Sequence, residues 1–307
     1  MRMEACVSEL RQFIPKENIF TDEPMANHTS FRIGGPADVF VKVQDEEQLT
    51  KALKYLKGDD VPYFVLGNGS NLLVSDAGYR GVILQIGPAM SRVWTEGTLV
   101  HAQAGASMHK AAKAAYENGL GGLEFASGIP GTVGGGAVMN AGAYGGEFRD
   151  VVETVSVVTA DGEKLTLDNE AMQFAYRHSV LLQHPYYVTE VTFRLYPEEQ
   201  AIIRGKMEDF AARRREKQPL EYPSAGSTFK RPEGFFAGKL IMDAGLRGYT
   251  VGGAKVSDKH CGFVINEKNA TAEDVHSVIR HVQRSVKERF GVDLETEVLF
   301  LGWENDR

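Results

Sequence analysis

The sequence predicts an α+β protein, and three observations support this. Short apolar runs that alternate like strands are interspersed with amphipathic helical patterns. The segment Glu124–Glu147 is rich in glycine and carries no charge between its end glutamates. A second glycine-rich loop, Val65–Asn71, ends the apolar run Val61–Leu66. With 307 residues, the chain is long enough for two or three domains, each with its own core.

The first predicted domain, residues 1–80, has the pattern of a small βαβ unit. Residues 1–20 are typical of a short amphipathic helix. The pattern then predicts a strand at Pro36–Val43, a helix at Glu46–Lys57 and a buried strand at Val61–Leu66.

The second predicted domain, residues 81–197, is mostly strand. Gly119 should end the predicted helix Ser107–Asn118 in a left-handed conformation. Asp161-Gly162 lies between two alternating runs and predicts a hairpin. The predicted elements are strands Val82–Ile86, Arg92–Trp94, Leu99–Ala104, Val152–Thr159, Glu163–Leu167 and Tyr187–Leu195, and helix Ser107–Asn118.

The third predicted domain, residues 198–307, follows a hinge at 197–199. Residues 271–274, Thr-Ala-Glu-Asp, form a predicted capping box for a helix that runs to Phe290 and ends at Gly291. The other predicted elements are helices Glu198–Lys217 and Phe236–Ala244, strand Gly262–Ile265 and a closing strand Leu294–Leu301.

Composition excludes several classes of protein. A net charge of −7 argues against nucleic acid as the main partner. Two cysteines without metal-ligand spacing exclude a disulfide scaffold, predict no metal site and favour a reducing cytoplasm. No apolar run approaches the roughly 18–20 residues of a membrane span, and the N-terminus lacks the apolar core of a signal peptide. We expect a monomer.

The two glycine-rich loops indicate a ligand with two phosphates, such as a dinucleotide, because bare backbone N–H groups hold phosphate oxygens. Taken singly, such a loop is more often only a tight connection. The P-loop and Rossmann signatures are both missing, so the sequence predicts a different dinucleotide architecture.

Five motifs occur along the chain in a fixed order. They are Gly67-Asn-Gly-Ser-Asn71, Ser127-Gly-Ile-Pro-Gly-Thr-Val-Gly134, Asn140-Ala-Gly-Ala143, Tyr176-Arg-His-Ser179 and Gly226-Ser-Thr-Phe-Lys230. In this order they resemble the MurB family, the UDP-N-acetylenolpyruvoylglucosamine reductases. The resemblance extends from about Asn27 to Gly302, and the ending Glu295-Thr-Glu-Val298 also resembles that family's last strand.

The resemblance implies a two-part FAD-binding region of the vanillyl-alcohol-oxidase type, followed by a smaller α+β domain for the substrate. It also implies noncovalent FAD, NADPH as reductant, and reduction of UDP-N-acetylglucosamine enolpyruvate to UDP-N-acetylmuramate. The chain has no room after Arg177 for the substrate-covering tyrosine loop of one class, so it resembles the shorter type II class. Leu299 stands where some members carry a second basic residue.

The resemblance also assigns site residues. Arg177 and Glu297 would stabilise an enolate at the substrate carboxylate, and Ser227 would donate the proton. Residues expected to bind the cofactor are Gly67, Asn68, Gly69, Ser70, Asn71, Ser127, Gly128, Ile129, Pro130, Gly131, Thr132, Val133, Gly134, Gly135, Ala141 and Gly142. Residues expected to contact the substrate are Tyr144, Arg214, Lys217, Lys230, Arg231 and Lys255.

Taken without the resemblance, these residues have simpler interpretations. Ser227 could bond only the backbone of its turn, and Arg177 could be a surface charge. On a strand, Glu297 would share a face with Leu299 and Leu301, which would raise its carboxyl pKa, although an edge-strand charge is equally compatible. Arg214 and Lys217 could simply complement a helix C-terminus. The sequence does not rank NADPH against NADH.

Two other classes fit parts of the pattern. One is a different flavin enzyme of the same superfamily, which often holds its flavin covalently through His or Cys; the glycine-rich loops contain neither. The other is a nucleotide-binding regulator without activity, which would have no need of Arg177, Ser227 and Glu297 together.

Overall fold

The computed structural model describes residues 2–303, which form two compact units. The first unit contains the residues up to Thr21, Val39–Asn68 and Gly81–Arg214. The second contains Asp22–Asp38, Gly69–Arg80 and the residues from Arg215 onward. The chain therefore passes between the units several times, and the first glycine-rich loop is divided between Asn68 and Gly69.

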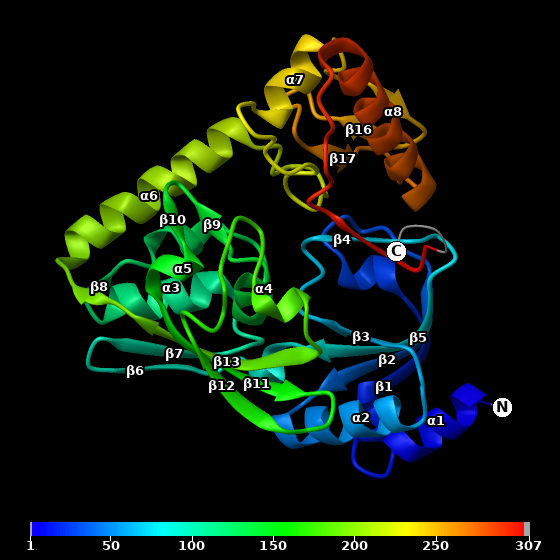
Figure 1. The fold of residues 1–307 in the computed structure, drawn as a ribbon, viewed down its shortest axis with the longest axis vertical. Coiled ribbons are helices and arrows are strands. Elements are labelled where there is room, and N and C mark those ends of the chain that lie inside the picture. Colours follow the sequence, from blue (N-terminus) through cyan, green and yellow to red (C-terminus); the bar gives the residue numbers. More distant parts are fainter. Residues whose placement is uncertain (1, 304–307) are drawn as a thin grey trace. The chain divides into compact units, whose positions relative to one another are not determined.

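A four-stranded sheet opens the first unit, in the order β1-β2-β5-β3 (Figure 1). β3 pairs with β5 in parallel, with Tyr63 opposite Val82. Leucines of α1 and α2 enter one core with valines of β2, because the apolar residues of both helices recur at helical spacing. The elements are α1 (Arg2–Leu10), β1 (Ile19–Pro24), β2 (Pro36–Val43), α2 (Glu46–Gly58), β3 (Tyr63–Leu66) and β5 (Tyr79–Ile86).

A five-stranded antiparallel sheet, in the order β12-β11-β13-β7-β6, is the second large sheet of the first unit. Gly162 closes the β11–β12 hairpin at a φ of 77°. Two short pairs, β8–β14 and β9–β10, lie outside it. The elements are β6 (Val93–Glu96), β7 (Leu99–Gln103), α3 (Met108–Glu117), β8 (Leu120–Gly121), β9 (Gly142–Ala143), β10 (Gly146–Glu147), α5 (Phe148–Val151), β11 (Val152–Thr159), β12 (Lys164–Asp168), β13 (Tyr186–Arg194) and β14 (Tyr196–Pro197).

A short helix, α4 (Val133–Val138), lies inside the glycine-rich segment. A Cβ on Gly136 would clash with the ring of Phe148, and one on Gly134 would meet Ala104 at 2.9 Å. These glycines therefore allow the helix to pack closely against neighbouring residues, although glycine disfavours helices in isolation.

The second unit contains a small antiparallel sheet, β15-β16-β17, whose strands pack with α7 and α8 in one core. A parallel pair joins distant segments, with Leu299 of β18 opposite Leu72 of β4. The elements are β4 (Leu72–Val74), α7 (Ala237–Asp243), β15 (Thr250–Val251), β16 (Ala254–Val256), β17 (Val264–Asn266), α8 (Ala272–Phe290) and β18 (Leu299–Leu301).

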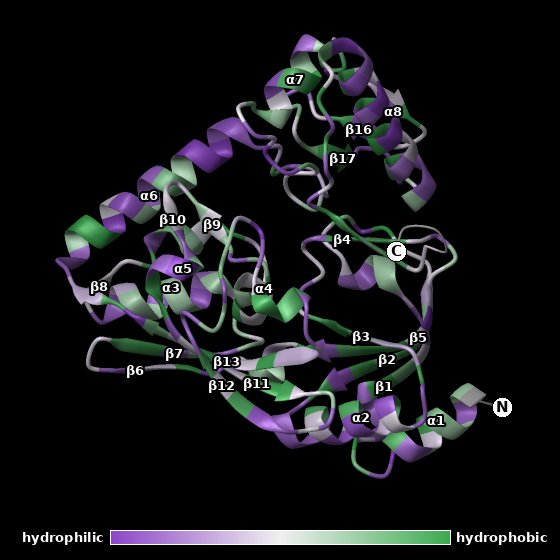
Figure 2. Cartoon of the chain, in the orientation of Figure 1, coloured by the Kyte–Doolittle hydropathy of each residue, from purple (hydrophilic) through white to green (hydrophobic). Residues whose placement is uncertain are grey.

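One long helix, α6 (Gln200–Lys217), follows β14. Figure 2 shows that it is largely hydrophilic, and Ile203 is the residue that it buries. Within the part of the chain that the structure describes, no helix has the length and apolar character that crossing a membrane requires.

Most predicted elements are confirmed to within a few residues, including the capping box and the left-handed Gly291 that bound α8. Two predictions are wrong. The helix expected over residues 1–20 ends at Leu10, and β1 begins at Ile19. The closing strand is only Leu299–Leu301, so Glu297 lies in a bend before it and shares no strand face with these leucines.

Candidate active site

The structure brings the two glycine-rich loops together in the first unit. A Cβ on Gly67 would lie 2.5 Å from the hydroxyl oxygen of Thr132, so only glycine allows this approach. Thr132 is buried and forms an isolated bridge with Ser107, which precedes α3. This contact therefore connects the loop that follows β3 with the segment that begins α3.

The backbone N–H groups around this junction fall into two sets. Those of Val133, Gly134 and Gly135 donate to Ala106 O (2.8 Å), Ala104 O (2.9 Å) and the Thr132 hydroxyl (3.2 Å). Those of Gly131 and Thr132 have no acceptor within residues 2–303. Gly131 has a φ of 121°, which favours glycine. The backbone N–H groups without an acceptor therefore lie in the middle of the predicted phosphate-binding segment, just before α4.

Other predicted cofactor residues have structural contacts. The Ser127 hydroxyl donates to Glu124 O at 2.7 Å. Asn71 lies in the second unit, where its side-chain amide donates to Glu297 O at 3.0 Å and its carbonyl accepts from Leu299 N at 3.0 Å. Asn71 thereby fixes the backbone of a predicted catalytic residue. Ala141 and Gly142 lead into the β9–β10 pair.

Arg177 lies at the tip of a tight turn in the first unit. Ala175 and His178 exchange both backbone hydrogen bonds, at 3.0 and 3.1 Å, and Arg177 has a φ of 53°. The Arg177 guanidinium lies 5.1 Å from the centroid of the Tyr176 ring. Tyr176 is exposed and Arg177 is half-buried, on a turn whose backbone is held at its base.

Asn140 holds the base of this turn, and its role was missed in the sequence. It is fully buried, its amide donates to Ala175 O at 3.0 Å, and its carbonyl accepts from Arg149 N at 2.9 Å. Its φ of 44° is left-handed, which Asn tolerates better than most residues. An Asn followed by Ala-Gly-Ala in a glycine-rich segment was the available signal.

Ser227 and Glu297 lie on neighbouring segments of the second unit. The Glu297 N–H donates to Thr228 O at 2.9 Å, and Phe229 forms a bridge with Thr296. Thr228 is buried and its hydroxyl accepts from Val264 N, which anchors this segment to β17. The structure thus places a hydroxyl and a carboxylate residue side by side along two paired segments.

The predicted substrate residues divide between the units. Tyr144 and Arg214 belong to the first unit, where Tyr144 stacks on Phe210 with ring centroids 4.7 Å apart. In the second unit, Lys255 is already held by Asp258 (2.7 Å) and Glu267 (2.9 Å), and these carboxylates raise the pKa of Lys255. Lys217 is exposed and has no partner among the described residues.

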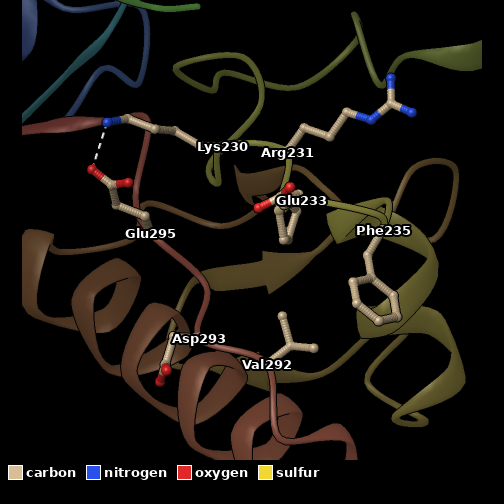
Figure 3. A pocket seen from close by; sticks show the side chains of 8 residues that line it. Lys230, Arg231, Glu233, Phe235, Val292, Asp293 and Glu295 are labelled. Atoms are coloured by element: carbon tan, nitrogen blue, oxygen red, sulfur yellow. Dashed lines mark hydrogen bonds and ion pairs between the residues drawn. The ribbon is translucent and has the colours of Figure 1, made fainter.

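Lys230 and Arg231 line a pocket of about 420 Å³ in the second unit (Figure 3). Lys230 pairs with Glu295, and Arg231 lies 4.0 Å from the Phe236 ring centroid. Glu233 and Asp293 also line the pocket, so its carboxylates outnumber its cations. This charge balance is poor for a diphosphate, which favours a role for Arg231 outside the pocket.

Comparisons with known proteins agree with the motifs. Residues 37–168 match the family model of an FAD-binding domain, and residues 218–301 match that of the UDP-N-acetylenolpyruvoylglucosamine reductase C-terminal domain. A UDP-N-acetylenolpyruvoylglucosamine reductase of Clostridium perfringens (strain SM101 / Type A) is 50% identical over 95% of this chain and 96% of its own length. One from Caldanaerobacter subterraneus subsp. tengcongensis is 49% identical over 97% and 99%.

A solved structure gives the same result. The crystal structure of UDP-N-acetylenolpyruvylglucosamine reductase (MurB) from Thermus caldophilus has 34% sequence identity and a TM-score of 0.79, covering 91% of this chain and 97% of that one. The FAD-binding region, the separate C-terminal domain and the resemblance read from the motifs are confirmed. The chain belongs to the UDP-N-acetylenolpyruvoylglucosamine reductase (MurB) family.

Proposed function

We propose that this protein uses NADPH and noncovalent FAD to reduce UDP-N-acetylglucosamine enolpyruvate to UDP-N-acetylmuramate, a step of peptidoglycan precursor synthesis in the cytoplasm. The observation that carries the proposal is the junction of Gly67 with Thr132, which gathers two glycine-rich loops in a chain of this family. The bare N–H groups of Gly131 and Thr132 suit the FAD diphosphate. Bound FAD would carry hydride between the two substrates.

The chain's own residues would act on the enolpyruvyl group. Hydride addition to its vinyl carbon places negative charge on the neighbouring carboxylate, which becomes an enolate. In this proposal Arg177 and Glu297 stabilise that enolate, and the Ser227 hydroxyl gives its proton to the enolate carbon. A hydroxyl is a weak acid and donates only to a strong base, which an enolate is. Asn140 and Asn71 would position the Arg177 turn and the Glu297 backbone.

The proposed substrate contacts differ in whether the cation is already paired with a carboxylate of the protein. We assign Lys217 and Arg231 to the UDP diphosphate, because Lys217 is an exposed cation and the Arg231 guanidinium lies against the Phe236 ring. Lys230 and Lys255 are already paired with carboxylates and would contribute less. Tyr144 would contact flavin or substrate. Domain boundaries at 80/81 and 197/198, and a monomeric state, are part of this proposal.

A spectroscopic experiment tests the function. Purified protein should be yellow, release its flavin on acid precipitation, and bleach with NADPH in the absence of air. Adding UDP-N-acetylglucosamine enolpyruvate should then restore the yellow colour. Flavin retained after acid would favour a covalent oxidase of the same superfamily, and a colourless protein that binds no FAD would favour a regulator. Reduced flavin that this substrate fails to reoxidise would contradict the proposed reaction.

A further inference from the structure

Arg214 is a half-buried cation of α6, whereas Arg215 and Lys217 of the same helix, which have no ion pair among the described residues, are exposed. Arg204 bonds the Tyr116 hydroxyl at 2.9 Å, Lys206 pairs with Glu124 at 3.1 Å, and Arg213 pairs with Asp209 at 2.7 Å. Arg214 is half-buried but has no ion pair or hydrogen bond within the described part of the chain. A partly buried cation without a counter-charge is destabilising, so this position calls for an anion supplied by a ligand.

The surroundings of Arg214 are those of the cofactor loop. A Cβ on Gly128 would lie 3.5 Å from Arg214 Cδ and 3.6 Å from Nη1, so the side chain passes directly over this glycine. One helical turn earlier, Phe210 stacks on Tyr144 with an interplanar angle of 5°, which fixes this part of α6. Burial lowers the pKa of Arg214, and the nearby Tyr144 opposes this shift.

The position along the loop separates Arg214 from the N–H groups assigned to the diphosphate. The bare N–H groups assigned to the diphosphate are at Gly131 and Thr132, whereas Arg214 lies over Gly128. Ile129 is extended, with φ −75° and ψ 125°. At about 3.3 Å per extended residue, the two places are on the order of 10 Å apart along the segment. Arg214 would therefore meet a different part of the dinucleotide than its diphosphate.

We propose that Arg214 is the counter-charge of the reduced isoalloxazine ring and thereby raises the reduction potential of the bound FAD. Hydride from NADPH adds two electrons and one proton to the neutral ring, so the ring gains one negative charge. A fixed guanidinium stabilises this charged form relative to the neutral oxidised form. The inference rests on the proposed function, and it moves Arg214 from the substrate contacts to the cofactor.

The test compares Arg214→Met, Arg214→Lys and Arg213→Met by anaerobic redox titration against a reference dye. Arg214→Met should weaken binding of reduced relative to oxidised FAD at least tenfold, which lowers the two-electron potential by at least about 30 mV. Arg214→Lys should keep most of the wild-type potential. Arg213→Met, whose partner is the exposed Asp209, is the matched control and should leave the potential unchanged.

Each other outcome has a defined meaning. An unchanged potential in Arg214→Met, or the same fall in Arg213→Met, would overturn the inference. Equal weakening of oxidised and reduced FAD would also overturn it and assign Arg214 to the diphosphate. If Arg214→Met is purified without flavin, titrating the apoprotein with oxidised and with reduced FAD gives the same ratio. Wild-type protein that binds no FAD would reject the proposed function instead.

Discussion

At the scale of single residues, the structure distinguishes side chains that are buried and stabilise the fold from neighbouring side chains that are accessible to a ligand. Thr228 is buried and bonds β17, while its neighbour Ser227 is half-buried and follows Gly226, whose φ is 76°. Sequence motifs made Ser227 a candidate because the motif is local, and its role stays a prediction. They missed the role of Asn140, because its partner Ala175 lies 35 residues away and is set by tertiary folding.

Ser227→Ala should separate the two half-reactions. Flavin binding and reduction by NADPH should stay nearly intact, because Ser227 has no role in removing hydride from NADPH. Reoxidation by UDP-N-acetylglucosamine enolpyruvate should slow by roughly 10²–10⁴-fold, as expected for a lost general acid. Stopped-flow absorbance of the flavin follows each step. Ser224→Ala, in the same turn, is the control, and slow reduction with fast reoxidation in Ser227→Ala would refute the role.

At the scale of elements, local signals were predictable and long-range pairings were not. The capping box and Gly291 defined α8 from the sequence, since each acts within one turn. The pairing of β4 with β18 joins segments over 200 residues apart, and no local sequence pattern predicts it. α4 was missed because its glycines disfavour helix, and only contacts such as Gly136 with Phe148 explain it.

The loop junction gives a prediction for cofactor binding. Gly67→Ala should push Thr132 away, since its Cβ would lie 2.5 Å from the Thr132 hydroxyl oxygen. We expect a large loss of bound flavin in purified protein, measured by absorbance after acid release. Gly58→Ala is the control, because a Cβ there meets nothing within 4 Å. Wild-type flavin content in folded Gly67→Ala would place the diphosphate elsewhere.

The start of α8 gives a prediction for stability. Asp76 accepts from Ala272 N (2.8 Å) and Glu273 N (3.0 Å), while Asp274 and Thr271 bond each other's N–H, so the first-turn donors are satisfied. Asp76→Ala should destabilise the protein by about 0.5–2 kcal/mol in urea unfolding followed by circular dichroism. Asp243→Ala, which removes one exposed partner of Lys239, should cost less. Equal losses of unfolding free energy in Asp76→Ala and Asp243→Ala would contradict a capping role for Asp76.

At the scale of the whole molecule, the charge distribution bears on how two nucleotides are handled. The protein carries a net charge of −7, yet NADPH and the sugar nucleotide are both anionic diphosphates. Attraction must therefore come from local cations rather than from the overall field. In the second unit, Lys217 is a cation with no carboxylate partner among the described residues, whereas Lys230 and Lys255 are neutralised by neighbours. With two of the predicted substrate cations already paired, one shared diphosphate site is favoured over two.

We therefore predict that NADPH and UDP-N-acetylglucosamine enolpyruvate use one site in alternation. High sugar nucleotide should inhibit by competing with NADPH, and initial-rate plots at low concentrations should be parallel. Lys217→Met should weaken both ligands by similar factors, roughly tenfold or more for a charged hydrogen bond of about 1.5–3 kcal/mol. The exposed, helix-paired Lys239 is the control, and Lys239→Met should change neither ligand. Intersecting plots, or a Lys217→Met effect on one nucleotide alone, would mean that each nucleotide has its own diphosphate site.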